Sequence, residues 1–415
     1  MKTDGIVCFA GNDWWMHNPM TEKQWMRQFA ADGTAVLFVN SIGIGMPGAG
    51  SPHVARRLLR KLRSLARWLR RDEGVWVLTP LLLPLWSVAP VRRLNLFLLT
   101  LQLRHAIKRT GMSRALFWAG IPTAALLLRH VHHDAVVYYV QDNYTAYYDS
   151  MSFTRVREDH ETLLRAADVV ICASVGLAER EAAFARRVEY IPHGVHPAFL
   201  EADLDSAGRD LPKALRGIPR PIVGYWGSLE ALQDRALVAA LARRHPEWSF
   251  VFIGRKMVDL DELEALHNVY YPGYLPIEDI PEYGVHFSVG LLSFVQTEWI
   301  RYSCPIKFRE YLALGLPVVS PPIIEVERVY PGEGHIARTV DEFSAAIREA
   351  IETDTPERRR ARRALVADES WAASAARVRA VLDSLDADAE ASGAQAPATH
   401  ESTRPASGAD KEGSA

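Results

Sequence analysis

Short apolar runs alternate along the chain with longer stretches in which apolar residues recur at helical spacing. Residues 6–10 predict a buried strand, 21–31 a helix and 35–40 a second strand. Continuous apolar strands separated by helices are typical of a parallel sheet that is covered on both faces. Residues 1–200 therefore predict one α/β domain. Further strands of this domain are expected at 75–79, 115–118, 135–140, 169–173 and 188–191.

The apolar period is lost over residues 201–219, where acids, prolines and a glycine indicate a linker. A second strand–helix alternation then predicts another α/β domain over 220–369. Residues 370–385 predict a terminal helix, and residues 386–415, which hold almost no large apolar side chain, are expected to be disordered. In the second domain we expect strands at 221–227, 249–254, 269–271, 287–292 and 318–319, and helices near 234–244, 305–314 and 341–352.

Two segments interrupt the rhythm of the first domain. Residues 54–71 carry eight basic residues and no acidic one, with leucines at helical spacing. This pattern predicts a basic amphipathic helix that contacts an anionic membrane surface, or else a peripheral helix that covers a sheet edge. Residues 75–103 are strongly apolar, but prolines and Arg92-Arg93 interrupt them. They predict a buried strand and a core helix, which could help dock the domain on a bilayer, rather than a membrane-spanning helix.

Charge and cysteine content narrow the class of protein. The net charge of the 415 residues is only −2, so we expect no nucleic-acid partner. Cys8, Cys172 and Cys304 match no zinc or redox spacing, which suits a reducing compartment. The apolar run at the start of the chain is too short for a signal peptide. We therefore expect a cytoplasmic protein.

The most informative stretch is 303–320. Pro305 suits the first turn of a helix, with Ser303 or Cys304 expected as its cap, and Gly315 followed by a proline ends the helix. A helix N-terminus offers N–H groups and partial positive charge to an anion. Lys307 lies in that first turn and Glu310 one turn later on the same face, so they can serve a diphosphate and a hydroxyl-bearing group. The alternative is an exposed ion pair of Lys307 with Glu310.

The run Pro305-x-Lys307-x-x-Glu310-Tyr-Leu-Ala-x-Gly-x-Pro-Val-Val resembles the nucleotide-sugar site of the GT-B glycosyltransferases of group 1. The resemblance implies an α/β fold of two Rossmann-like domains, whose parallel sheets face each other across an interdomain cleft, and a terminal helix that crosses back to the first domain. It implies a nucleoside-diphosphate sugar as substrate, with no cofactor. Helix termini and basic residues would stabilise the leaving diphosphate, so no metal site is expected.

The same resemblance implies further donor-binding residues. Gly227 and Ser228 follow the first strand of the second domain, where glycine lets the backbone approach a phosphate; a tight turn without a ligand is the alternative. Arg255 follows the second strand and is a candidate for a phosphate or the base. The backbone of Tyr274 and Leu275, after the third strand, is a candidate for reading the base edge. Asp234 is expected as the cap or a first-turn acid of the next helix rather than as a ligand.

The first domain offers candidates for the acceptor side. Asp142 ends the strand 135–140 and is our candidate base, because an acceptor hydroxyl must lose its proton as it attacks the sugar; a turn cap is the alternative. Asp13 and His17 are alternative bases in the loop after the first strand. Trp14 and Trp15 of that loop are interpreted either as sugar-stacking side chains or as interdomain packing.

Several positions depart from the family pattern. The resemblance would place acids at 143 and 302, but Asn143 and Tyr302 stand there, and His193 and His196 replace the asparagine and aspartate of a Pro-Asn-Gly-Val-Asp motif. The absent acid at 302 favours an inverting branch. His193 remains a candidate for the donor site, with Gly194 as a turn residue.

Together these features predict a metal-independent hexosyltransferase that acts on a glycan or lipid-linked acceptor. We expect it in bacterial surface polysaccharide or glycolipid synthesis, in peripheral contact with the inner face of the plasma membrane. The alternatives are a nucleotide-sugar epimerase of the same fold and a catalytically degenerate, membrane-docked partner in a polysaccharide assembly complex.

Overall fold

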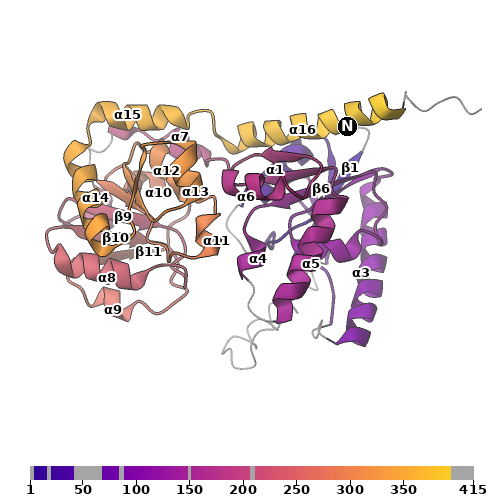
Figure 1. Cartoon of the computed structure of the whole chain (residues 1–415), viewed down its shortest axis with the longest axis horizontal. Helices are drawn as coiled ribbons and strands as arrows, with labels where there is room; N and C mark the ends of the chain where they lie inside the picture. Colours follow the sequence, from indigo (N-terminus) through magenta and orange to yellow (C-terminus); the bar gives the residue numbers. More distant parts are fainter. Residues whose placement is uncertain are drawn as a thin grey trace, which may run out of the picture.

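A computed structural model describes residues 4–15, 20–41, 68–83, 88–147, 151–205 and 211–393, without the side chains of 147, 151–154 and 386–393. Two α/β domains lie side by side, and the helix α16 starts at their junction and lies along the first domain (Figure 1). Most of the expected basic helix at 54–71, the candidate base His17 and residues 394–415 of the expected tail lie outside the described residues.

The first domain is built on an eight-stranded sheet in the described part of the chain, with the order β3-β4-β2-β1-β5-β6-β7-β8. All neighbouring pairs are parallel except β3 with β4. The strands are β1 (Gly5–Phe9), β2 (Ala35–Val39), β3 (Leu69–Asp72), β4 (Val75–Leu78), β5 (Ala115–Ala119), β6 (Ala135–Val140), β7 (Val169–Cys172) and β8 (Val188–Tyr190).

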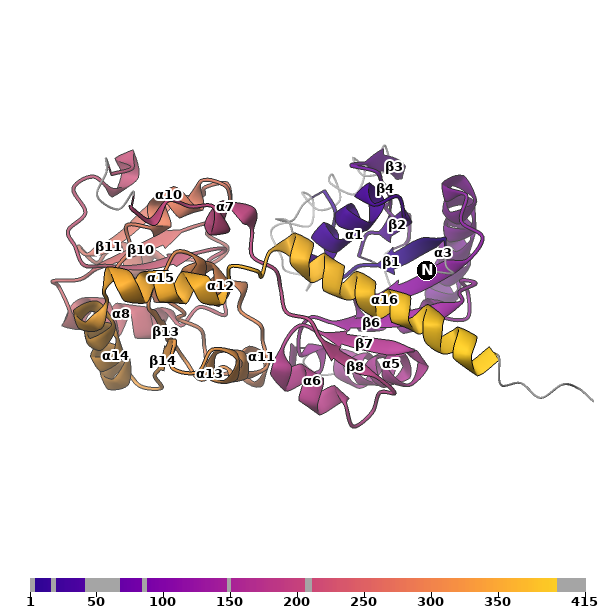
Figure 2. The same cartoon turned by 90° about the horizontal axis from the view of Figure 1, so that it is seen from above.

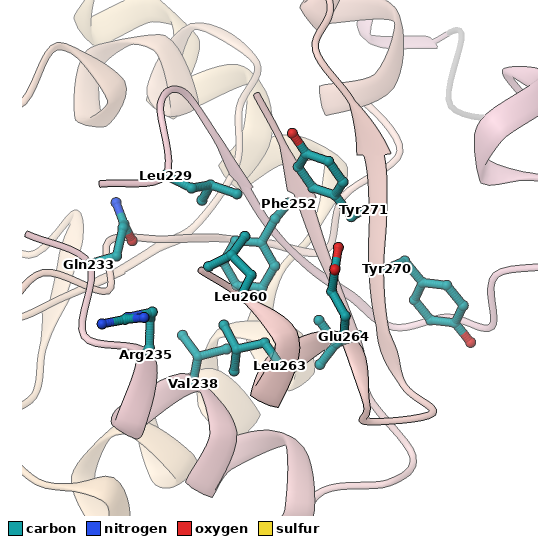
Figure 3. Close-up of a pocket in the computed structure, with 11 residues that line it drawn as sticks. Leu229, Gln233, Arg235, Val238, Phe252, Leu260, Leu263, Glu264, Tyr270 and Tyr271 are labelled. Atoms are coloured by element: carbon teal, nitrogen blue, oxygen red, sulfur yellow. The ribbon is translucent and has the colours of Figure 1, made fainter. Parts of the chain in front are cut away.

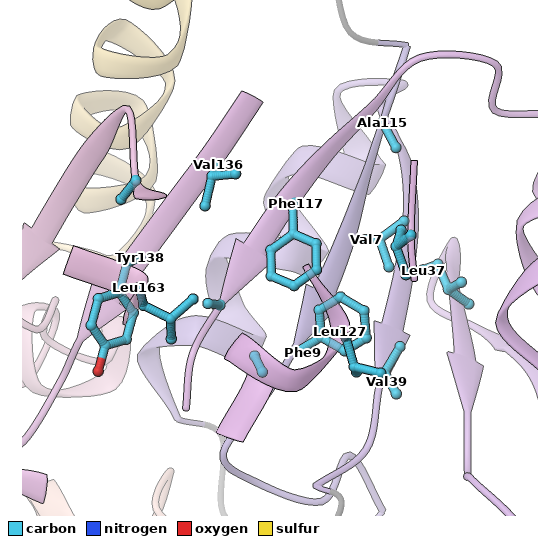
Figure 4. Close-up of a cluster of buried hydrophobic side chains, with 14 of the residues drawn as sticks. Val7, Phe9, Leu37, Val39, Ala115, Phe117, Leu127, Val136, Tyr138 and Leu163 are labelled. Carbon is cyan, nitrogen blue, oxygen red and sulfur yellow. The ribbon is translucent and has the colours of Figure 1, made fainter. Parts of the chain in front are cut away.

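Helices cover both faces of this sheet. One face carries the core of Figure 4, in which Phe9 and Phe117 pack with ring centroids 4.7 Å apart. The other face is covered by α1 and α16, whose Trp25 and Val378 are fully buried. The helices of this domain are α1 (Thr21–Ala31), α3 (Ala89–Thr110), the 3₁₀ helix η1 (Pro122–Leu127), α4 (Tyr144–Tyr147), α5 (Met151–Ala166) and α6 (Val175–Glu181). The helix α7 (Pro197–Leu200) packs in the core of the second domain, where Phe199 lies against Trp226, so the first domain ends slightly before the expected residue 200.

The second domain has a six-stranded parallel sheet in the described residues, with the order β11-β10-β9-β12-β13-β14. Its strands are β9 (Ile222–Trp226), β10 (Ser249–Ile253), β11 (Val269–Gly273), β12 (Val289–Leu291), β13 (Val318–Ser320) and β14 (Gly334–Ile336). Its helices are η3 (Lys213–Leu215), α8 (Arg235–Arg244), α9 (Asp261–Glu264), α10 (Ile280–Gly284), α11 (Glu298–Arg301), α12 (Ile306–Ala313), α13 (Ile324–Val329), α14 (Val340–Thr353) and α15 (Pro356–Leu365). The predicted fold class, with two Rossmann-like domains, is confirmed.

The terminal helix α16 (Trp371–Gly393) leaves the second domain and lies against the first (Figure 2). Trp25 Nε1 of α1 donates to Ser374 Oγ over 3.1 Å, and Arg379 donates to Thr34 Oγ1. The expected start of disorder at 386 is wrong for residues 386–393, which continue α16. These residues are rich in alanine, a strong helix former, so a docked helix extends through them without large apolar side chains.

The expected helix at 54–71 is wrong at its C-terminal end, because residues 69–71 belong to strand β3. A tight turn with positive φ at Glu73 (48°) and Gly74 (82°) pairs β3 antiparallel to β4. Arg70 and Arg71 are exposed on this edge strand, where basic side chains discourage pairing with another chain. The leucines and arginines of residues 54–71 follow a helical pattern in the sequence, so the prediction extended the helix through 69–71 because the turn at Glu73 and Gly74 was not recognised.

Candidate functional site

Strand order locates the ligand edge of each sheet. In both domains the order reverses direction around the first strand: β2-β1-β5 in the first domain and β10-β9-β12 in the second. Ligands of such sheets bind outside the carboxyl ends of the strands at this switch point. Gly227 follows β9 at the second switch point, and Gly11 and Gly120 follow β1 and β5 at the first.

Lys307 reaches directly over the Gly227 turn. A Cβ at position 227 would lie 2.4 Å from Lys307 Cε and 2.8 Å from its Nζ, and Gly227 has a φ of +126°. Lys307 is half-buried, with Nζ 5.4 Å from the ring centroid of Tyr225. Burial lowers the pKa of Lys307, but Tyr225 and Glu310 raise it more, so the pKa lies above its ordinary value. A fixed ammonium group thus stands beside the glycine turn.

The helix α12 presents its N-terminus without a side-chain cap. Its N-cap is Pro305, so the expectation of Ser303 or Cys304 at this position is wrong: a proline in extended conformation already starts the helix. Because no side chain of the cap accepts from the first turn, its N–H groups can serve an anion. Gly315, with φ +69°, ends the helix as expected, and a Cβ there would lie 2.7 Å from Arg359 O.

Glu310 is 4% exposed, which excludes an exposed ion pair with Lys307. Its Oε2 accepts a 2.7 Å hydrogen bond from Trp226 Nε1, at the end of β9. Burial raises the pKa of Glu310, although the Trp226 bond and the charge of Lys307 oppose this effect. The carboxylate is therefore held rigidly beneath the same turn that Lys307 covers.

The remaining donor candidates lie around the ends of β10 and β11. The guanidinium of Arg255 stacks 4.4 Å from the ring centroid of Tyr274, which is 45% exposed. Leu275 is half-buried against the domain core, and Ser228 O accepts from Tyr225 Oη at 3.4 Å. The loop containing Ser228 is held to the Arg255 loop, because Leu229 N donates to Arg255 O over 2.8 Å.

Asp234 caps α8 as expected, since its Oδ1 accepts from Leu237 N at 2.9 Å. A small cavity of about 20 Å³ lies between α8, α9 and β11, lined mainly by apolar side chains (Figure 3). Its volume suits at most a water molecule, so it is no nucleotide site. A larger hollow of about 470 Å³ lies beside α11 and is lined by residues that include Thr297, Arg301, Pro322 and Arg338.

Asp142 lies at the switch-point edge of the first domain, after β6. It is half-buried, and burial raises its pKa from 3.8 to about 7. The neighbouring Gln141 Nε2 donates to Tyr144 Oη over 2.6 Å, and Tyr144 Oη donates to Gly120 O over 3.0 Å. Asp142 thus borders a rigid polar cluster at the ends of β5 and β6.

The loop after β1 is tied into its own domain. Asp13 Oδ1 accepts from Trp15 N over 2.9 Å. Trp14 is 1% exposed, and its Nε1 donates to Asp72 Oδ2 over 2.7 Å. Trp14 also packs edge-on against Phe38 at 4.9 Å, so it belongs to the core of the first domain and neither interpretation of it from the sequence holds.

The segment leading into α12 is held by the first domain. Asn143 Nδ2 donates to Glu298 O over 3.3 Å, and Ser174 Oγ donates to Tyr302 O over 2.7 Å. The Tyr302 ring lies 5.0 Å from the guanidinium of Arg180. Where the family pattern would have an acid, Tyr302 therefore provides an interdomain contact. Asp142, next to Asn143, is thereby placed at the domain junction.

A buried charge network, absent from the sequence interpretation, anchors α12. Arg309 and Glu325 are both fully buried and form a 2.6 Å ion pair. Glu325 Oε2 accepts from Val175 N at the start of α6, and Glu325 Oε1 accepts from Tyr190 Oη of β8. Arg309 also contacts Glu369, before α16, over 2.9 Å. The helix α12 and the first domain are thus joined through one pair of charges.

The two chain crossings between the domains run side by side. Val195 N donates to Glu369 O over 2.7 Å, and a Cβ at Gly194 would lie 2.6 Å from Trp371 Cα. Gly194 is thus required for this close approach. His193 Nδ1 lies 3.3 Å from Tyr139 Oη, and burial lowers the pKa of His193 to about 4. His196 caps α7 by accepting from Ala198 N.

Within the described residues, no group of three or more histidine, cysteine, aspartate or glutamate side chains is arranged to hold a metal ion. In the same part of the chain, no helix combines the length and apolarity needed to cross a membrane.

The sequence and the fold of this chain are similar to those of known proteins. Residues 220–353 match the family model described as glycosyl transferases group 1. The TuaH protein of Bacillus subtilis (strain 168), whose name assigns it to teichuronic acid biosynthesis as a glycosyltransferase, is 24% identical over 222 residues. That match covers 50% of this chain and 55% of TuaH, so about half of the relative's length is matched.

Solved structures share the fold over most of the chain. Anabaena HepE in complex with UDP superposes with a TM-score of 0.62 and 15% identity, covering 91% of this chain and 100% of that chain. Sucrose-phosphate synthase from Thermosynechococcus elongatus gives a TM-score of 0.66 at 14% identity, covering 92% of this chain and 99% of that chain. The second domain thus matches the group 1 glycosyl transferase model, and the fold of the whole chain is that of the GT-B glycosyltransferases.

Proposed function

We propose that this protein transfers a hexosyl group from a UDP-sugar to a glycan or lipid-linked acceptor in bacterial surface polysaccharide or glycolipid synthesis. One observation carries the proposal: Lys307 Nζ stands over the Gly227 turn, beside the uncapped start of α12, at the switch point of the second sheet. A positive charge, a backbone that a ligand can approach closely and a helix N-terminus together suit a diphosphate. The UDP in the HepE complex supports uridine as the base.

Each donor candidate has a role in this proposal. Lys307 and the first turn of α12 neutralise the diphosphate as it leaves. Glu310, fixed by Trp226 Nε1, accepts hydrogen bonds from ribose or sugar hydroxyls. Arg255 and Tyr274, stacked at the ends of β10 and β11, flank the base.

Asp142 acts on the acceptor in an inverting reaction. Its carboxylate takes the proton of the attacking hydroxyl as the new C–O bond forms at the anomeric carbon. The bond from that carbon to the diphosphate oxygen breaks, and its electron pair stays on the diphosphate. A base with a pKa of about 7 suits this step near neutral pH. Asp13 is the alternative base on the same edge.

The acceptor class is supported by the Bacillus subtilis relative whose name assigns it to teichuronic acid biosynthesis. We place the reaction at the inner face of the plasma membrane, where a lipid-linked glycan presents its end to a peripheral protein.

The decisive assay supplies purified protein with a panel of UDP- and GDP-sugars and lipid-linked glycans from a bacterial membrane extract. Release of UDP together with growth of the glycan is expected for one donor. Conversion of the sugar without an acceptor would instead show an epimerase, and the absence of any turnover with any donor would contradict the proposal.

A further inference from the structure

Exposed large apolar side chains are concentrated in one part of the described chain. Five of the ten most exposed ones fall within residues 83–101, while Phe184 (63%), Met257 and Leu365 stand singly elsewhere. The five are Leu83 (46%), Val88 (43%), Leu94 (45%), Phe97 (60%) and Leu101 (46%). Single exposed apolar residues need no explanation, but a contiguous group does.

Helix α3 carries apolar residues on two faces, and the fold uses only one. Leu99 and Leu103 on the inner face are buried in the core, and Gln102 Oε1 accepts from Trp68 Nε1 over 3.0 Å. Leu94, Phe97 and Leu101 follow at i, i+3 and i+7, so they share the opposite face. We call Leu94, Phe97 and Leu101, with the flanking Arg93 and Arg104, the outer face of α3.

The charge of α3 has one sign. Its 22 residues include no aspartate or glutamate, although the whole chain has a net charge of −2. Its basic residues are Arg92, Arg93, Arg104, Lys108 and Arg109, and Arg93, Arg104 and Lys108 are exposed beside the apolar stripe. An apolar stripe flanked by cations matches the boundary between the acyl chains and anionic head groups of a bilayer.

The outer face lies near the expected acceptor edge. Because α3 follows β4, its first turns start at the carboxyl edge of the first sheet, where Asp142 also lies. Four strand intervals separate β4 from β6, which corresponds to roughly 19 Å. Figures 1 and 2 both place α3 on the outer flank of the first domain, away from the second domain.

We propose that the outer face of α3 docks the first domain on a bilayer that contains anionic lipid. Leu94, Phe97 and Leu101 insert at the level of the head groups, and Arg93 and Arg104 pair with lipid phosphates. The helix lies on the surface and does not cross the bilayer. Docked in this way, the start of α3 and the neighbouring carboxyl edge of the first sheet lie close to the membrane surface, in which lipid-linked molecules diffuse.

The experiment measures co-sedimentation of the full chain with vesicles of phosphatidylglycerol and phosphatidylcholine, and with vesicles of phosphatidylcholine alone. Phe97→Glu is the test variant. Phe184→Glu is its matched control, because Phe184 is equally exposed in the same domain but lies outside α3. Arg93→Glu/Arg104→Glu tests the charges, and circular dichroism confirms that each variant is folded.

Binding of the wild type to anionic vesicles is expected, with at least about tenfold weaker binding of Phe97→Glu and of the arginine variant and unchanged binding of Phe184→Glu. Added salt should weaken binding, because it screens the arginines. Equal binding of Phe97→Glu would overturn the proposal. So would a concentration-dependent dimer that Phe97→Glu dissociates while vesicles bind nothing, since a second copy would then cover the face.

Failure of the docking proposal can be distinguished from failure of the proposed enzymatic function. UDP affinity is measured on the same variants without lipid, and it should be unchanged in Phe97→Glu. Loss of vesicle binding with normal UDP binding concerns docking alone, whereas absence of UDP binding in the wild type concerns the donor site alone.

Discussion

At the scale of single residues, Gly227 shows how closely the donor candidates are packed. Gly227→Ala places a Cβ against Lys307 Cε and strains a φ of +126°, so UDP affinity should fall at least about tenfold. Gly217→Ala is the control, because Gly217 has a φ of +83° but no atom within 4 Å of the place that its Cβ would take. Calorimetric titration with UDP measures both variants, and equal affinity in the two would show that the contact with Lys307 is irrelevant to binding.

Asp142 makes a prediction about pH. Because the base must be ionised and burial raises its pKa to about 7, kcat/KM should rise with pH through about 7 and then level off. Asp142→Asn should lower kcat by about 10²–10⁴-fold and abolish this rise. Asp159→Asn is the control, since burial also raises the pKa of Asp159, to about 6, but Asp159 lies within the helix α5 and does not follow a strand. If Asp142→Asn retained the wild-type pH profile, another group would be the base, and Asp13 would be tested next.

At the scale of elements, the sequence predicted most strands and helices, because continuous apolar runs and helical periodicity are strong local signals. The missed elements are short or polar. Strand β14 (Gly334–Ile336) is half-buried at a sheet edge, and α15 (Pro356–Leu365) is dominated by arginines. Periodicity of apolar residues cannot reveal such elements.

The candidate site was only partly predictable for a related reason. The 305–319 run indicated Lys307 and Glu310. It did not indicate that Arg309, between them in the sequence, binds acidic side chains outside the run. Its pairing with Glu325 joins residues 16 positions apart and reaches the first domain at Tyr190. Contacts of this kind depend on the tertiary fold, so no local sequence pattern predicts them.

The buried pair also yields a prediction about stability. Glu325→Ala leaves the Arg309 guanidinium buried with one acidic partner fewer, which should cost about 3–5 kcal/mol in the free energy of unfolding. Arg309→Met/Glu325→Leu should restore part of this loss, because no unpaired charge remains. Urea-induced unfolding measures the variants, and a double variant that is no more stable than Glu325→Ala would argue against a charge penalty.

At the scale of the whole molecule, two acids, the buried Glu22 and the half-buried Asp142, should make stability depend on pH. Burial raises the pKa of Glu22 from 4.5 to about 7 and that of Asp142 from 3.8 to about 7. The folded chain therefore holds protons that the unfolded chain has already released, so stability falls as pH rises from about 4 to about 7. Above pH 7 the two contributions are constant.

Urea midpoints at pH 5 and pH 8 test this dependence. The wild type should be less stable at pH 8, and Glu22→Gln/Asp142→Asn should show a smaller difference between the two pH values. An unchanged difference in the double variant would assign the pH dependence to other groups.

The fold of the two domains positions Lys307 at the proposed donor site. The most direct test of that assignment is calorimetric titration of UDP into the wild type, Lys307→Ala and Lys213→Ala, the last being an exposed lysine of the linker. Binding by the wild type and by Lys213→Ala, with affinity at least about tenfold weaker in Lys307→Ala, is the predicted result. Full affinity in Lys307→Ala would contradict the account.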